Sequence, residues 1–208
     1  MYLVPTNLLE SGHDIEAHYI DILQAVCGSV NLPVSIKLTP YLSAIGHFAV
    51  ALVQHGAAGL VLFNRLMEPD IDLLNMKMMD TLELSDSAEL RLPLLWIAIL
   101  AGRTKASLAI STGVRTVDDV VKSLLAGADA VMTTSALLHN GIGYLSTLTA
   151  GLRQWMEERE IASIGDMRGM LSWQHSPNRS EYTRTNYLRI LENYSASASN
   201  SFPWPQVD

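Results

Sequence analysis

Residues 106–138 read ASLAISTGVRTVDDVVKSLLAGADAVMTTSALL, and this stretch decides the expected fold. A short apolar run at 107–110 is followed by residues 118–125, whose apolar side chains recur at helical spacing. A second apolar run follows at 130–132. The stretch is therefore predicted to form a β-α-β unit with two buried, parallel strands.

Both ends of the predicted helix carry their own markers. Thr116 stands where an N-cap belongs, because its hydroxyl can accept from a free N–H group of the first turn. Asp118 and Asp119 follow near the positive end of the helix dipole. Gly127 stands where a left-handed glycine ends a helix. These markers predict the helix bounds independently of its apolar pattern.

Small polar residues follow each of the two predicted strands. Carboxyl ends of neighbouring parallel strands meet at one rim, and a (β/α)₈ barrel typically binds phosphate on that rim with its last two loops. Hydroxyl groups, close backbone N–H groups and a helix N-terminus suit an anion. An ordinary pair of βα turns, which also favours Ser, Thr and Gly, is the alternative. The residues are Ser111, Thr112 and Gly113 after the first strand, and Thr133, Thr134 and Ser135 after the second.

The rest of the chain repeats the same rhythm. Apolar strands are expected at 34–38 and 59–63, and amphipathic helices at 15–30, 43–55 and 89–101. Continuous apolar strands separated by such helices indicate a parallel sheet covered by helices.

Four further segments complete the predicted organisation. Residues 66–84 are too long for a plain loop and are expected to form a small hairpin or lid. A helix is expected within 141–160, and two short ones at 164–171 and 181–194. The domain is predicted to span residues 1–194, beginning with a strand-like Met1 to Val4. Residues 195–208 are expected to be a loosely ordered tail.

Composition narrows the class of protein. The chain has 208 residues, 49% of them hydrophobic, and a formal net charge of −7. This balance argues against a nucleic-acid or anionic-membrane partner. The single Cys27 cannot form an intramolecular disulfide, and no apolar run reaches the roughly 18 residues of a membrane span. The histidines show no metal-binding spacing, so no metal site is predicted. A cytoplasmic protein is expected.

Several stretches in the right order resemble the class 1 dihydroorotate dehydrogenase family. They are 33–39 (PVSIKLT), 59–65 (GLVLFNR), 69–73 (PDIDL), 89–103 (ELRLPLLWIAILAGR) and 106–138. The resemblance runs from the first residues to about Tyr194. It implies an FMN-binding (β/α)₈ TIM barrel that oxidises a CH–CH bond of a pyrimidine precursor or related substrate, with hydride passing to the flavin N5.

The resemblance also implies roles for individual residues. Lys37 is similar to the lysine that contacts the flavin, with a rim ion pair as its alternative. Asn64 is similar to the asparagine that faces the substrate, with a turn cap as its alternative. Arg65 is expected to bind a substrate carboxylate or to form a surface ion pair. The two hydroxyl-rich loops match the FMN phosphate loops.

Departures from the family pattern set further expectations. Thr112 replaces a common glycine, and its side chain is expected to crowd the phosphate. The family's first three strands and most of the fourth are expected to lie before Met1, which leaves the C-terminal half to two-thirds of the barrel. The catalytic base then falls in residues 5–12, where Ser11 is the only hydroxyl candidate apart from Thr6. Ser11 is otherwise a polar residue that leads into a helix.

Such a part of a barrel would expose the edges of an apolar parallel sheet, which soluble proteins avoid. The expected partners are therefore a small-molecule substrate and either another copy of the chain or a separately encoded N-terminal half. Two functions remain open at this point. One is the FMN-dependent oxidoreductase, and the other is a catalytically inactive remnant that serves as a phosphate-binding or interaction module.

Overall fold

The computed structural model describes residues 4–65, 69–79, 81–182, 187–191 and 193. The chain divides into two compact units, residues 1–175 and 176–208. The second unit contains the 3₁₀ helix η2 (Arg179–Tyr182) and a helical segment at 187–191. The predicted boundary at residue 194 and the tail at 195–208 lie outside the described residues, as do Met1 to Leu3 of the expected first strand.

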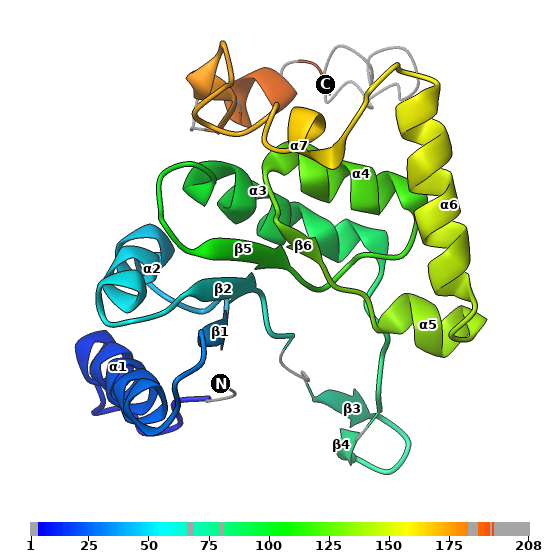
Figure 1. The fold of residues 1–208 in the computed structure, drawn as a ribbon. Helices are drawn as coiled ribbons and strands as arrows, with labels where there is room; N and C mark the ends of the chain where they lie inside the picture. The colour runs from blue at the N-terminus through cyan, green and yellow to red at the C-terminus, as the bar shows by residue number, and fades with distance from the viewer. Residues whose placement is uncertain (1–3, 66–68, 80, 183–186, 192, 194–208) are drawn as a thin grey trace, which may run out of the picture. The chain divides into compact units, whose positions relative to one another are not determined.

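The first unit is built on one parallel sheet (Figure 1). Its strands are β1 (Ser35–Leu38), β2 (Gly59–Leu62), β5 (Ser107–Ile110) and β6 (Ala130–Val131). They lie in the order β1-β2-β5-β6, and every pair is parallel. Spatial order thus equals chain order, as in a barrel wall, whereas a doubly wound sheet reverses its order at a switch point.

Helices cover one face of this sheet. The helices α2 (Ile45–Gln54), α3 (Arg91–Leu100) and α4 (Val117–Ala126) follow β1, β2 and β5 and pack against one another in that order (Figure 1). α1 (Gly12–Ser29) packs against α2. Alternate side chains of a strand point to the same face of its sheet. On the face covered by these helices, the aligned side chains of β1, β2 and β5 are buried. They are Ile36, Leu38, Leu60, Leu62, Leu108 and Ile110.

The opposite face of the sheet is partly open. The register aligns Lys37, Val61, Ala109 and Ala130 on it. Ala130 is exposed, and Lys37 and Ala109 are half-buried. In a closed barrel this face points to the interior and is filled by side chains of the other strands. Residues 130–131 thus form the predicted strand, but the expectation that residues 130–132 are buried is wrong, because Ala130 and Met132 are exposed and Val131 is half-buried.

Two helix starts show how local sequence fixes the bounds. Thr116 is the N-cap of α4, its hydroxyl accepts from the N–H of Asp119, and Gly127 ends the helix at φ +117°, all as predicted. α1 begins three residues before the predicted 15–30 helix, because Ser11 is its N-cap. Asp14 is the third residue of the helix, and its carboxylate accepts from the backbone N–H of Ser11, which completes a capping box.

The segment between β2 and α3 confirms the expected hairpin. β3 (Asp70–Asp72) and β4 (Lys77–Met79) pair antiparallel. Oδ1 of Asp72 accepts from the N–H groups of Leu74 and Asn75 at 2.9 and 3.1 Å, which closes the turn. A 3₁₀ helix, η1 (Ser87–Leu90), then leads directly into α3.

The remaining helices of the first unit follow β6. They are α5 (Ser135–Asn140), α6 (Tyr144–Glu157) and α7 (Ile164–Met167). α7 ends four residues before the predicted end of the 164–171 helix, where Arg168 turns extended and Gly169 adopts φ +76°. Among the described residues, no helix combines the length and apolar character needed to cross a membrane.

Candidate functional site

A small hollow of about 130 Å³ opens at the carboxyl ends of the strands. Every residue that the sequence predicted to hold the cofactor lines it, and Arg65 and Ser85 line it as well. The lining residues are Lys37, Arg65, Ser85, Ser111, Thr112, Gly113, Val114, Met132, Thr133, Thr134 and Ser135. Two predicted loops and the end of β1 thus converge at one place.

Backbone hydrogen bonds beyond the strand ends hold this rim in register. The N–H of Ser111 donates to the carbonyl of Leu62 at 2.7 Å, and the N–H of Phe63 donates to the carbonyl of Ser111 at 3.1 Å. On the other side of β2, the N–H of Asn64 donates to the carbonyl of Leu38 at 2.6 Å. The loops after β1, β2 and β5 are therefore fixed side by side.

The loop after β5 turns in the left-handed region. Thr112 has φ +80° and Gly113 has φ +78°. A β-branched residue rarely adopts this conformation, and here the Thr112 hydroxyl donates to the carbonyl of Phe63 at 3.1 Å. At Gly113 a Cβ atom would lie 2.4 Å from the backbone nitrogen of Leu90, so only glycine fits. Thr112 therefore follows the backbone path of a glycine, with its hydroxyl proton already engaged.

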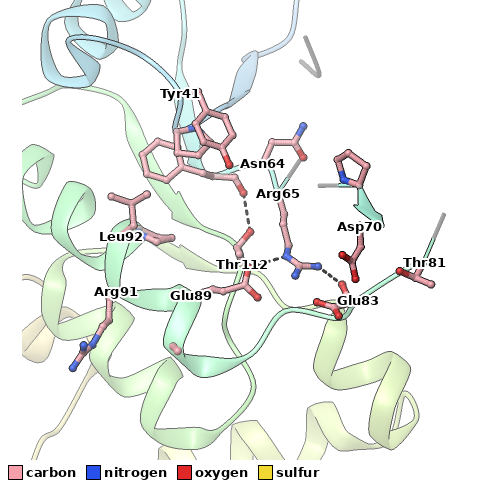
Figure 2. A pocket seen from close by; sticks show the side chains of 15 residues that line it. Tyr41, Asn64, Arg65, Asp70, Thr81, Glu83, Glu89, Arg91, Leu92 and Thr112 are labelled. Atoms are coloured by element: carbon pink, nitrogen blue, oxygen red, sulfur yellow. Dashed lines mark hydrogen bonds and ion pairs between the residues drawn. The ribbon is translucent and has the colours of Figure 1, made fainter. Parts of the chain in front are cut away.

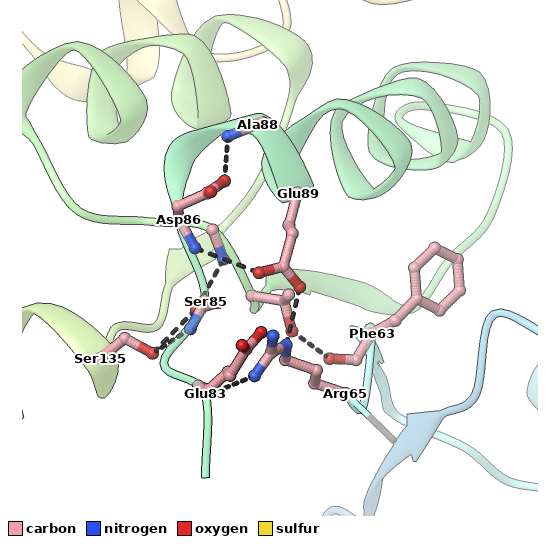
Figure 3. A network of polar contacts seen from close by, with 10 residues as sticks. Phe63, Arg65, Glu83, Ser85, Asp86, Ala88, Glu89 and Ser135 are labelled. Carbon is pink, nitrogen blue, oxygen red and sulfur yellow. Dashed lines mark hydrogen bonds and ion pairs between the residues drawn. The ribbon is translucent and has the colours of Figure 1, made fainter. Parts of the chain in front are cut away.

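Ser85 joins the loops of the small hollow (Figure 3). This side chain is 6% exposed, its Oγ lies 2.8 Å from Oγ of Ser135, and it accepts from the N–H of Gly113 at 3.3 Å. The backbone N–H of Ser85 also donates to Oγ of Ser135 at 3.2 Å. Sequence reasoning missed Ser85 because it follows the expected lid. Its only local mark is a hydroxyl directly before the cap residue Asp86.

A larger hollow of about 550 Å³ adjoins the first at the same rim (Figure 2). Arg65 and Thr112 line both hollows, and Asn64 lines the larger one. Its volume lies within the usual range for small-molecule sites, roughly 300–1,000 Å³. The lining residues are Pro40, Tyr41, Phe63, Asn64, Arg65, Pro69, Asp70, Thr81, Glu83, Ala88, Glu89, Arg91, Leu92, Pro93 and Thr112.

Arg65 forms an ion pair within this larger hollow. Its Nε donates to Oε2 of Glu89 at 2.7 Å, and its Nη1 donates to the backbone carbonyl of Glu83 (Figure 2). Oε1 of Glu89 accepts from the N–H of Asp86 at 3.1 Å, in the capping box of η1. The structure thus shows the ion pair that was the alternative reading of Arg65, while the contact with a substrate carboxylate stays a prediction.

Asp119 anchors the segment that carries Ser85 and Glu89. It is 2% exposed, and its Oδ2 accepts from Oγ of Ser87 at 2.6 Å and from the N–H groups of Arg115 and Thr116 at 3.0 and 2.9 Å. Burial acts to raise the pKa of Asp119, but the hydrogen bonds from Ser87, Arg115 and Thr116 outweigh it, and the pKa is lowered. A buried carboxylate therefore ties η1 to the start of α4.

Ser11, the candidate base, lies at the start of α1. Its Oγ donates to Oδ2 of Asp14 at 2.6 Å, and this bond is the largest cause of the lowered pKa of Asp14. Ser11 lines neither hollow. The structure shows it as the polar residue that leads into a helix, and its catalytic role stays a prediction.

Known proteins match most of this chain. A family profile described as dihydroorotate dehydrogenase matches residues 7–156. The chain belongs to this family. It is 28% identical over 165 residues to the catalytic subunit of dihydroorotate dehydrogenase B (NAD⁺) of Pyrococcus furiosus, which covers 78% of this chain and 55% of the relative. It is 26% identical over 166 residues to the chloroplastic dihydropyrimidine dehydrogenase (NADP⁺) of Arabidopsis thaliana, and this match covers 71% of the chain and 39% of the relative.

A solved structure supports the fold. The dihydroorotate dehydrogenase of Eimeria tenella, in complex with ferulenol, superposes with a TM-score of 0.60 at 16% identity. The match covers 78% of this chain and 49% of that one. The chain thus spans about half the length of the relatives that it matches. Its parallel sheet is part of a (β/α)₈ barrel.

Proposed function

We propose that this protein is an FMN-dependent oxidoreductase acting on a CH–CH bond of a pyrimidine precursor or a related small molecule. One observation carries the proposal. In a member of the dihydroorotate dehydrogenase family, every residue predicted to hold FMN lines one hollow at the carboxyl ends of the strands. This rim is where barrels bind phosphate groups.

The donor set of the small hollow fits a phosphate. Lys37 would supply positive charge, and the loops after β5 and β6 would supply backbone N–H groups and hydroxyl groups. Two hydrogen-bond donors of this hollow already have partners. The Thr112 hydroxyl donates to Phe63, and Ser85 accepts from Gly113. We therefore expect the site to accept FMN phosphate with modest affinity.

Oxidation of a CH–CH bond removes a hydride from one carbon and a proton from the other, and leaves a double bond. FMN, when bound, supplies the N5 acceptor for the hydride. The Lys37 ammonium would offset negative charge on the ring, and the Asn64 amide would orient the substrate. Ser11 is the candidate to accept the proton, which requires it to reach the substrate.

FMN titration of the purified chain tests the proposal. We expect a colourless protein that binds FMN with a dissociation constant above about 1 µM, since each restricted donor costs on the order of 1–3 kcal/mol and 1.4 kcal/mol is tenfold in affinity. Inorganic phosphate should compete. Thr112→Gly should tighten binding by removing the methyl group. Lys37→Met should weaken it, whereas Lys122→Met, exposed on α4, should not.

Three other outcomes are informative. Stoichiometric flavin on the purified protein would strengthen the enzyme reading, and no binding of FMN or phosphate would overturn the assignment of the loops. Phosphate or FMN binding without flavin reduction by any dihydropyrimidine would favour the inactive binding module instead.

A further inference from the structure

The larger hollow at the rim carries an unusual charge balance for a site that would bind an acid. Three carboxylate side chains line it, those of Asp70, Glu83 and Glu89, against two guanidinium groups, those of Arg65 and Arg91. Figure 2 shows the three carboxylates grouped around the Arg65 side chain. Among the described lining residues the acidic groups therefore outnumber the basic ones.

Neither cation is placed to receive a substrate carboxylate. Arg65 donates through Nε to Glu89 and through Nη1 to the carbonyl of Glu83, so an incoming carboxylate at this guanidinium would meet the charge of Glu89. Arg91 is exposed, and its side chain projects away from Arg65 (Figure 2). Like charges in one pocket weaken binding unless another cation compensates, and no third cation lines the described part of the hollow.

The remaining lining suits an uncharged, flat, polar ring. Phe63, Tyr41 and Pro93 offer apolar and aromatic surface, and Asn64 and Thr112 offer neutral polar groups. Carboxylates such as Glu89 and Glu83 accept hydrogen bonds from the N–H groups of a cyclic amide. A ring with N–H and C=O edges satisfies this lining without adding a negative charge.

We propose that this hollow selects a neutral pyrimidine ring over one that carries a carboxylate, and that Glu89 is a specificity-determining residue. The inference rests on the proposed function and sharpens its substrate class. Glu89 acts by neutralising the charge of Arg65, and the Glu83 carboxylate supplies the repulsion of a second carboxylate. Relatives bearing the names dihydroorotate dehydrogenase and dihydropyrimidine dehydrogenase both match this chain, so family membership alone leaves the choice open.

Uracil and orotate test the proposal, because they differ only by a carboxylate on the ring. Calorimetry and ligand-observed NMR on the full chain, with and without saturating FMN, should show uracil binding at least tenfold more tightly than orotate. Glu89→Gln should narrow this ratio at least tenfold, through tighter orotate binding, with uracil little changed. Glutamine can still complete the η1 capping box, so the fold should survive.

Two further variants separate the charge from the ion pair. Glu83→Gln removes a carboxylate, but the backbone carbonyl of residue 83 can still accept from Arg65. This variant should also bind orotate more tightly relative to uracil. Glu157→Gln, exposed on α6 and outside the hollow, changes the net charge equally and should leave the ratio unchanged.

The outcomes are distinct. Wild-type protein that binds orotate as tightly as uracil, or more tightly, overturns this inference and leaves the proposed function standing. An unchanged ratio in Glu89→Gln overturns the role of Glu89. No binding of either ring, with or without FMN, overturns the inference together with the proposed function.

Discussion

Ser87→Ala is expected to lower the free energy of unfolding by about 1.5–3 kcal/mol at pH 7, the usual worth of a hydrogen bond to a charged group. Oγ of Ser87 donates to Oδ2 of Asp119 at 2.6 Å, and Asp119 is 2% exposed. The alanine leaves the carboxylate with one donor fewer and no access to water. The effect is local to the join between η1 and the start of α4.

The stability loss should depend on pH with a definite sign. The folded-state pKa of Asp119 is lowered below its ordinary 3.8, so its contribution is fully present above about pH 5 and is lost as the pH falls through the folded-state value. The penalty of Ser87→Ala should therefore shrink on acidification. Asp119→Asn cannot titrate at this position, so the unfolding free energy of this variant should depend less on pH below about pH 5.

Urea denaturation at several pH values between 7 and 3 measures these changes. Ser146→Ala is the matched control, because Ser146 is exposed on α6, and it should change the unfolding free energy by less than about 0.5 kcal/mol. A Ser87→Ala loss below about 0.5 kcal/mol at pH 7, or a loss that grows as the pH falls, would refute the anchoring role of Asp119.

Three other predictions follow from packing. Tyr19→Phe should raise the unfolding free energy by about 1–2 kcal/mol in urea, because the buried Tyr19 hydroxyl has no partner among the described residues; a clear loss would mean that it has one. Gly113→Ala should lower the unfolding free energy by at least about 3 kcal/mol, because the new methyl group would overlap the backbone of Leu90. Gly141 also has a positive φ but open space around it, so Gly141→Ala should lower it by only about 1–2 kcal/mol. Equal losses in the two variants would contradict this. Light scattering should show association, because one face of the sheet is partly open at Ala130 and its neighbours, and a stable, non-aggregating monomer would count against it.

The sequence by itself determined the elements and the rim. Strand and helix periodicity, the Thr116 cap and the Gly127 end depend on residues within a few positions of one another, so the chain states them locally. Parallel strand polarity then placed the hydroxyl loops at one rim, and the small hollow contains both of them. Family resemblance added Lys37, which lines the same hollow.

Only the tertiary structure decided how the polar groups of the rim pair. Arg65 meets Glu89 across 24 positions, Ser87 meets Asp119 across 32, and Ser85 meets Ser135 across 50. The burial of residues 130–132 was also misjudged, because an apolar run does not show which face of its strand the other elements cover. Long-range pairs of this kind leave no periodic trace in a sequence, since they depend on loop paths and packing that the whole chain sets together.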